Sequence, residues 1–370
     1  MRRWMLALMC LVLLCGSCAA EDSVQRALEA TDLRELEEFA GNAAPGLALR
    51  QVVEDASQGK LTSPDVLLER LRDLMCSALR EVVRACGMLI VPVLLLATLR
   101  CMLPEGSGGS EGARFLLMCA LMQGMIRLVL DGMADVEACM RQIGGFATVV
   151  SPPLAALMTA AGMTNGASLL SPLAALVGGV VEDGLLKYGL PLCRYTLAIA
   201  VAGNLSETID LGRACRLMRR GTNWSAGLAV TLFTALTAIQ GTVAGGMDGV
   251  AVRTAKYAVD SVTSVIGSGV SDAWDSYVAG ILIARNAVGV SGVALLLAMG
   301  LKPMLRAGAA MLMLNLFAAL TDMLGERRAA RAAEQAAGVC QMLLMLCAAS
   351  LTLGMILLGA AMSMGQAMLG

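Results

Sequence analysis

Long stretches without any charged residue constrain this chain more than any other feature. Two of them run from Gln142 to Val181 and from Gly221 to Met247. A membrane-spanning helix needs roughly 20 consecutive apolar residues. The first stretch is therefore long enough for two spans with a turn near residues 164–166, and the second holds one span. Such runs indicate an integral membrane protein.

The composition supports the same class. Hydrophobic residues make up 57% of the chain and charged residues 15%, with a mean hydropathy of +0.72. Soluble domains carry about a quarter charged residues. The excess consists of Leu, Ala, Met and Gly, and these small and aliphatic residues suit closely packed helices in lipid. We see neither the short alternating segments nor the aromatic girdles of a β-barrel. We therefore expect an all-α, polytopic bundle.

The apolar segments predict about seven to nine spans within a transmembrane domain at 85–370. The second and fifth segments are weaker candidates, because Arg127 and Arg194 lie within them. The candidate spans are 85–103, 113–130, 142–161, 167–186, 188–206, 223–246, 278–300, 304–322 and 339–361.

The beginning of the chain has the pattern of an export signal. Residues 1–20 combine two arginines, a short apolar run and small residues before Glu21. Cys18 as a lipidated residue is an alternative interpretation. Residues 21–84 are richer in acidic than in basic residues and carry apolar positions at helical spacing. They predict a small amphipathic helical domain outside the cytoplasm.

The distribution of arginines predicts the orientation only in part. The loop 204–222 is the most basic, so it should face the cytoplasm. The same rule conflicts with the end of the chain, where the predicted spans place Arg327, Arg328 and Arg331 outside. One of the last three spans, or the region 247–277, is therefore wrongly assigned.

A short proline-containing sequence repeat has two interpretations. Residues 151–157 (SPPLAAL) recur as residues 171–176 (SPLAAL). Two neighbouring helices broken by proline could meet at a central site, as in some transporters. The alternative is a coincidence in a sequence rich in Leu and Ala.

The sequence offers little support for catalysis. Histidine is absent, which removes the commonest general base and metal ligand. Outside the predicted export signal, which contains Cys15 and Cys18, no C-x-x-C pair occurs, and most of the 12 cysteines lie in apolar runs, where they act as small hydrophobic residues. The net charge of −1 gives no reason to expect a nucleic-acid partner. We expect no enzyme activity, metal or cofactor.

Polar residues inside apolar segments are the candidate functional residues, because each charge there costs at least about 2.5 kcal/mol. Arg285 and Asn286 lie in the middle of a predicted span, and the segment 247–277 predicts an amphipathic helix. The candidate pore-lining or assembly residues are Gln240, Asp248, Arg253, Lys256, Arg285, Asn286 and Asn315.

Short motifs from Tyr188 to Leu320 resemble the stage III sporulation protein AE family of endospore-forming bacteria. In chain order they are Tyr188-Gly189-Leu190-Pro191, Gly203-Asn204-Leu205-Ser206, Gln240-Gly241-Thr242, Asp248-Gly249-Val250, Arg253-Thr254-Ala255-Lys256, Arg285-Asn286-Ala287-Val288-Gly289 and Asn315-Leu316. Arg285 stands where the family leads us to expect lysine, which keeps the charge but changes the hydrogen-bonding geometry.

The resemblance implies a membrane subunit of the channel-like, secretion-like complex that connects mother cell and forespore. It also implies a place in the mother-cell membrane around the forespore. The implied partners are the other membrane proteins of that complex, including an ATPase and ring-forming subunits, with further copies of the chain as another partner. The alternative function is a self-sufficient secondary transporter of a small solute, which the number of spans and the proline-containing repeat favour.

Overall fold

The computed structural model describes residues 34–43, 72, 76, 80–84, 87, 91, 93–95, 98, 108–205, 212–263 and 269–363. Within these ranges the chain is helical apart from two short turns, and no strand occurs. The elements are α2 (Arg34–Ala43), α5 (Gly108–Ala160), α6 (Thr164–Gly179), η1 (Val180–Gly189), α7 (Leu190–Leu205), α8 (Gly212–Thr263), α9 (Gly269–Met323) and α10 (Arg327–Ser363). The predicted all-α class is confirmed.

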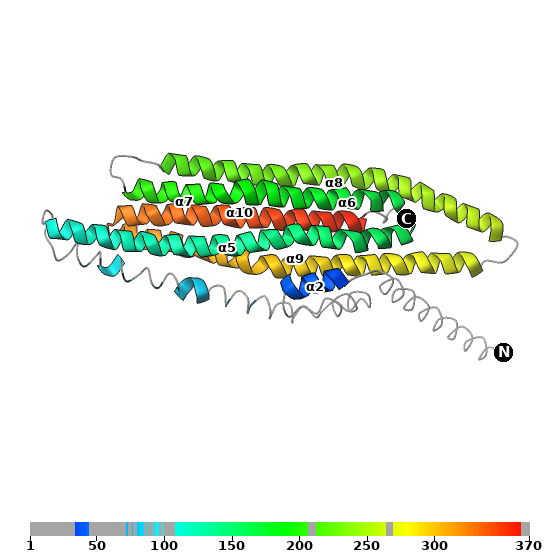
Figure 1. The fold of residues 1–370 in the computed structure, drawn as a ribbon, viewed down its shortest axis with the longest axis horizontal. Coiled ribbons are helices and arrows are strands. Elements are labelled where there is room, and N and C mark those ends of the chain that lie inside the picture. Colours follow the sequence, from blue (N-terminus) through cyan, green and yellow to red (C-terminus); the bar gives the residue numbers. More distant parts are fainter. Residues whose placement is uncertain are drawn as a thin grey trace.

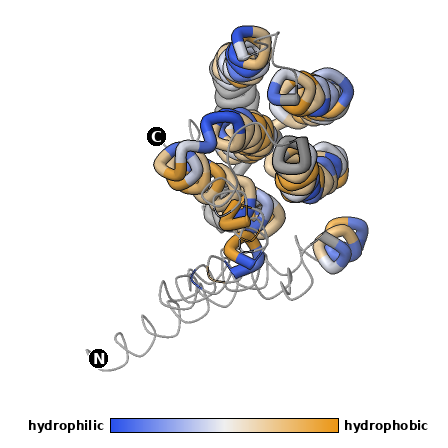
Figure 2. The backbone as a smooth tube through the Cα atoms, turned by 90° about the vertical axis from the view of Figure 1, so that its left-hand side faces the viewer, coloured by the Kyte–Doolittle hydropathy of each residue, from blue (hydrophilic) through white to orange (hydrophobic). Residues whose placement is uncertain are grey.

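The long helices form an elongated bundle with α10 at its centre. Figure 1 shows them lying along one common axis, with α8 on one edge and α2 near the opposite edge. Figure 2 looks along this axis and shows the helices as adjacent, nearly parallel columns. Helix α10 contacts α5, α7, α8 and α9, and α5 contacts both α6 and α9.

Three pairs of predicted spans are each one continuous helical stretch. Helix α5 contains the candidates 113–130 and 142–161, and α9 contains 278–300 and 304–322. The candidates 167–186 and 188–206 follow each other through α6, η1 and α7 without a turn. Helix α5 has 53 residues, so it is about 80 Å long, far more than the roughly 30 Å of the hydrocarbon layer.

Five helical stretches are long and apolar enough to cross a membrane, so the count of seven to nine spans is not confirmed. They are Phe115–Ala160, Thr164–Asn204, Gly212–Gly241, Val278–Met323 and Arg327–Ser363. Most of the predicted span 85–103 lies outside the described residues.

Two tight turns of the same kind connect neighbouring helices. Gly162 and Gly325 have φ angles of 83° and 82°, which an L side chain rarely adopts. In the first turn, Gly162 N donates to Thr159 O and Met163 N donates to Met158 O, each at 2.9 Å. This pairing satisfies carbonyls that the end of a helix otherwise leaves free. The turn between α5 and α6 therefore comes close to its predicted position at 164–166.

The prolines do not divide the helices into half-helices. Pro152 and Pro153 lie inside α5, and Pro172 lies inside α6. Such prolines are tolerated in membrane helices when neighbouring groups satisfy the freed carbonyls. The backbone does change at η1, a π-helical segment directly before Pro191 on α7.

The continuous helices remove the conflict in the predicted orientation. Because α9 crosses the bundle once, the start of α8 and the start of α10 lie at the same end (Figure 1). The arginines at 213–220 and those at 327–331 therefore gather at one end of the bundle. The expected error in the last three spans is thus the division of α9 into two.

Two predicted regions remain, the segment 247–277 and residues 1–84. The described parts of 247–277 form the end of α8, up to Thr263, and the start of α9, from Gly269. Most of residues 1–84 lie outside the described residues, including the predicted signal and Cys18. Helix α2 packs on α5, with the rings of Phe39 and Phe146 6.2 Å apart. A separate extracytoplasmic domain is not confirmed.

Glycines allow the closest contact in the bundle, between α9 and α10. A Cβ atom added to Gly289 would lie 2.6 Å from Met362 Sδ, and one added to Gly292 would lie 3.0 Å from Leu358 Cδ1. On the other helix, a Cβ added to Gly354 would lie 3.0 Å from Leu296 Cδ1. Small residues on both helices thus make room for large ones, as in close helix packing in membranes.

Candidate functional site

Arg285 is the one charged residue of α9 between Ser276 and Leu301, and it lies inside the bundle. Its side chain is only 1% exposed. Nη2 donates a hydrogen bond of 2.9 Å to the backbone oxygen of Met362, and Nη1 lies 3.6 Å from Met163 Sδ. A longer contact of 3.5 Å joins Nη2 to Asn286 Oδ1. The guanidinium therefore connects α9 with two other parts of the chain.

These contacts lie where helices end. Met362 is in the last turn of α10, whose final carbonyls have no partner within the helix. A cation beside such carbonyls is also favoured by the partial negative charge at the carboxyl end of a helix. Met163 belongs to the turn between α5 and α6. Arg285 thus lies at the junction of α9, the end of α10 and the α5–α6 turn, which suits a role in packing and assembly.

Among the other predicted residues, Asn286 adjoins Arg285, whereas Asn315 lies far from it on the same helix. Asn286 and Asn315 are both exposed on α9, and the 30 positions between Arg285 and Asn315 correspond to about 45 Å along a helix. Gln240 is half-buried on α8, and no donor in the described part of the chain reaches its Oε1. Three further predicted residues lie on the last third of α8, and the structure does not describe their side chains. They are Asp248, Arg253 and Lys256.

Ion pairs between helices form a second polar region, closer to the basic end of the bundle. Arg306 on α9 pairs with Asp135 on α5 and lies 3.9 Å from Glu81 Oε2. Arg194 on α7 donates to Glu137 on α5 at 3.0 Å. These charged residues lie inside continuous helices. A charged residue in the sequence therefore does not by itself show where a helix ends.

The sequence indicated Arg194 as a charge in an apolar segment but missed its carboxylate partner. The predicted spans 113–130 and 142–161 leave Asp135 and Glu137 between them. A signal was nevertheless present: residues 126–143 contain no proline and a single glycine, and apolar residues keep helical spacing through them. That pattern predicts an uninterrupted helix.

Two buried cysteines lie close together in the same part of the bundle. The sulfur atoms of Cys139 on α5 and Cys347 on α10 are 3.8 Å apart. Cys193 and Cys340 are also buried, as expected for small hydrophobic residues. Among the described residues, no group of three or more Cys, Asp or Glu side chains is arranged to hold a metal ion.

Comparison with known proteins decides the family. The family model of stage III sporulation protein AE matches residues 47–365, most of the chain. The chain belongs to the stage III sporulation protein AE family. A relative, stage III sporulation protein AE of Bacillus subtilis (strain 168), is 25% identical over 182 residues, which cover 49% of this chain and 45% of the relative. The match thus spans about half the length of that relative. No solved structure matches the chain.

The resemblance to the stage III sporulation protein AE family is therefore confirmed, and it supports a role in sporulation. The apolar helices support a membrane location. Several of the family-like motifs lie at contacts between helices. The 285–289 motif contacts the end of α10, and Gly189 of the 188–191 motif faces Leu346, where an added Cβ would lie 2.8 Å from Cδ2.

Asn204, within the 203–206 motif, is a structural residue that the sequence did not reveal. Its side chain is 8% exposed, and Nδ2 donates hydrogen bonds of 2.7 Å to Gln335 Oε1 and to Ala200 O. The pair joins the end of α7 to α10. The sequence marks Asn204 only as part of a family-like motif and gives no sign of this contact.

Proposed function

We propose that this chain is a membrane subunit of the channel-like, secretion-like sporulation complex that connects mother cell and forespore. It would act in the mother-cell membrane around the forespore, as a structural or pore-associated subunit without enzyme activity. Its proposed partners are the other membrane proteins of that complex, including an ATPase and ring-forming subunits. Membership of the family over residues 47–365 is the observation that carries this proposal.

The outer face of α9 supports a role in assembly. Asn286 and Asn315 are exposed there, and exposed apolar residues surround the second of them, with Leu312 64% and Leu316 57% exposed. A polar side chain facing lipid is unfavourable, whereas a neighbouring protein can satisfy it. The exposed amides therefore suit a helix that contacts another subunit.

The position of Arg285 favours a subunit over a self-sufficient transporter. A transporter of that kind needs polar groups that converge on a site open to its substrate. Here the charge within the apolar part of α9 is covered by the α5–α6 turn and the end of α10. The prolines that suggested two half-helices lie inside continuous helices.

Site-specific photo-crosslinking in sporulating cells tests this proposal. A photoreactive residue replaces Asn286 or Asn315 on α9, and a matched variant carries it at Leu232, which is 56% exposed on α8. The full chain carries an affinity tag at its carboxyl terminus. We expect crosslinks from α9 to other membrane proteins of the sporulation complex, identified by mass spectrometry after purification.

Two results would contradict the proposal. One is a protein that purifies from sporulating cells without any of those partners and gives no crosslinks from either α9 position. The other is uptake of a defined solute by liposomes that contain the purified chain alone, which would favour the transporter. The Leu232 variant shows how much crosslinking arises from exposure in the membrane alone.

A further inference from the structure

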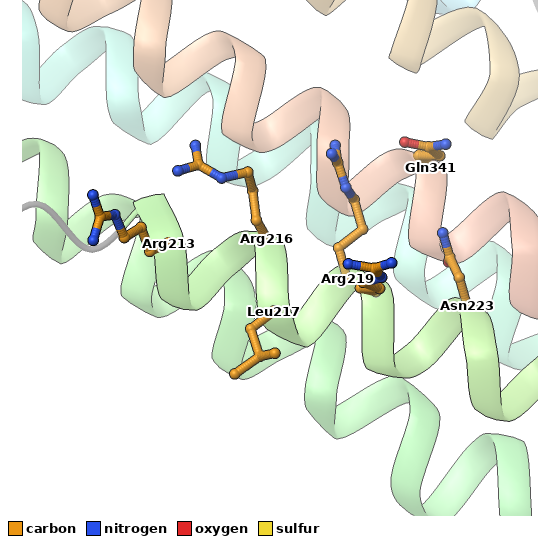
Figure 3. Close-up of a pocket in the computed structure, with 7 residues that line it drawn as sticks. Arg213, Arg216, Leu217, Arg219, Asn223 and Gln341 are labelled. Carbon is orange, nitrogen blue, oxygen red and sulfur yellow. The ribbon is translucent and has the colours of Figure 1, made fainter.

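A groove lined by arginines lies between α8 and α10 and plays no part in the proposed function. It has a volume of about 710 Å³ (Figure 3). Four arginines from the first turns of α8 form most of its wall, and α10 contributes a glutamine. The lining residues are Arg213, Arg216, Leu217, Arg219, Arg220, Asn223 and Gln341.

The side chains of the groove are oriented toward α10. Figure 3 shows Arg216, Arg219 and Asn223 extending from α8 to the side on which α10 lies, whereas Leu217 points away. A glycine on α10 makes room for one guanidinium, because a Cβ atom added to Gly338 would lie 3.1 Å from Arg219 Nη1. The groove is thus shaped by both helices.

The positive charge of the groove is not neutralised within the described part of the chain. None of its four arginines has a carboxylate within 4.0 Å there, unlike Arg194 and Arg306, which pair with α5. The amino end of α8 adds the partial positive charge of a helix start. Four cations in one groove repel each other, and a bound anion reduces that repulsion.

The outward face of α8 places this groove at the level of lipid headgroups. After the arginines comes Trp224, 70% exposed, and then exposed Leu228, Leu232 and Leu236 within the uncharged stretch that begins at Gly221. The order basic, aromatic, aliphatic is typical of a helix that enters a bilayer from the cytoplasmic side. Anionic lipids are attracted to such basic pockets between helices.

We propose that the α8–α10 groove binds the headgroup of an anionic phospholipid. Arg216 and Arg219 hold the phosphate, because guanidinium groups match phosphate oxygens with two parallel donors. The oxygen Oδ1 of Asn223 is buried and lacks a donor among the described residues, so it accepts a hydrogen bond from a headgroup hydroxyl. This site is separate from the proposed contact between subunits and stands without it.

Lipid titration of the purified full-length protein tests the proposal. Native mass spectrometry of the protein in neutral detergent measures the Kd of the first bound phosphatidylglycerol. We expect the double variant Arg216→Gln/Arg219→Gln to bind it about tenfold more weakly or worse. The matched control, Arg327→Gln/Arg328→Gln, removes two exposed arginines from the same end of the bundle. We expect it to change the Kd by less than about twofold, because these residues lie outside the groove.

Further arms separate the sources of the phosphate and guard against misfolding. Phosphatidylcholine and inorganic phosphate are tested as competitors, and neither should displace the lipid. The variant Arg216→Lys/Arg219→Lys keeps the charge and should retain most of the binding. If the glutamine pair fails to give a monodisperse protein on size exclusion, Asn223→Ala replaces it, with an expected loss of at least threefold for phosphatidylglycerol.

Several results would overturn the proposal. Equal weakening by the control pair would mean a diffuse charge effect, and displacement by inorganic phosphate would mean a site for a soluble anion. Equal affinity for phosphatidylcholine would exclude recognition of the negative charge. Unchanged lipid binding in the glutamine pair, together with loss of a co-purified protein, would assign the groove to an acidic protein partner.

Discussion

Helices α8 and α10 are both candidate spans, but α10 lies at the centre of the bundle and α8 at its edge (Figure 1). Of the most apolar stretch of α10, 61% is buried inside the protein, compared with 17% for α8. Helix α10 packs against α9 through glycine and leucine, whereas α8 exposes a row of leucines along its outer face. The more apolar of the two helices is thus the buried one, and small residues on α9 and α10 allow their close contact.

The first prediction compares a leucine from each helix. Leu353 on α10 is fully buried, and Leu232 on α8 is 56% exposed. Leu353→Ala should lower the free energy of unfolding by roughly 2–5 kcal/mol, because it leaves a cavity in the core. Leu232→Ala should change it by less than about 0.5 kcal/mol. Thermal unfolding in detergent, followed by size exclusion, measures both, and equal losses would contradict the assignment of α10 to the core.

The second prediction concerns the end of the α9–α10 pair. Arg285→Leu should cost roughly 1.5–3 kcal/mol, because it removes a hydrogen bond from a charged donor to Met362 O. It should also abolish sporulation while the protein still inserts into the membrane. The stability of Arg285→Lys should lie between that of Arg285→Leu and that of the unchanged protein, since lysine keeps the charge but lacks the planar set of donors of arginine. The measurements are thermal stability, membrane fractionation and the count of heat-resistant spores.

Gln240 on α8 supplies the control for Arg285. Because no donor among the described residues reaches its amide oxygen, Gln240→Met should leave stability unchanged or raise it slightly. Normal spore counts in the Arg285→Leu strain would refute the importance of the junction. A loss of stability in Gln240→Met as large as that in Arg285→Leu would mean that the hydrogen bond of Arg285 contributes no more to stability than the unbonded amide oxygen of Gln240.

The sequence was sufficient for some of these features and insufficient for others. The uncharged stretch from Gln142 to Val181 correctly predicted two helices with a turn between them. It could not show that α9 is one helix, because Lys302 and Arg306 resembled the boundary of a span. Arg306 is paired with Asp135, which is 171 positions away in the chain. A pattern within one segment carries no information about such a partner.

The sequence also isolated Arg285 but could not show its surroundings. A lone charge in an apolar segment indicated a candidate pore-lining or assembly residue without naming its contacts. Which carbonyl or sulfur it meets depends on where α5 and α10 end, and helix ends are set by turns far away in the chain. The glycines at 162 and 325 with positive φ angles are the local signs of those turns.

The third prediction tests the role of small residues directly. A Cβ atom at Gly300 on α9 would collide with the side chain of Leu351 on α10, whereas one at Gly227 on α8 would meet no atom within 4 Å. Gly300→Val should therefore cost about 1–3 kcal/mol through overpacking. Gly227→Val should have little effect on stability. If both variants unfold at the same temperature as the unchanged protein, close packing does not hold α9 against α10.

The smallest expected effect belongs to the ion pairs, and it sharpens the comparison at the basic end of the bundle. Double-mutant cycles are built from Asp135→Asn with Arg306→Gln, and from Glu137→Gln with Arg194→Gln. In the first pair the Arg306 side chain is 25% exposed, and in the second the Arg194 side chain is 55% exposed. We expect a coupling energy of about 1 kcal/mol for the first pair and about half of that or less for the second. The order follows from solvent, which screens the more exposed arginine more strongly. A stronger coupling in the second pair would mean that lipid, not water, surrounds Arg194, and would place that end of α7 within the membrane.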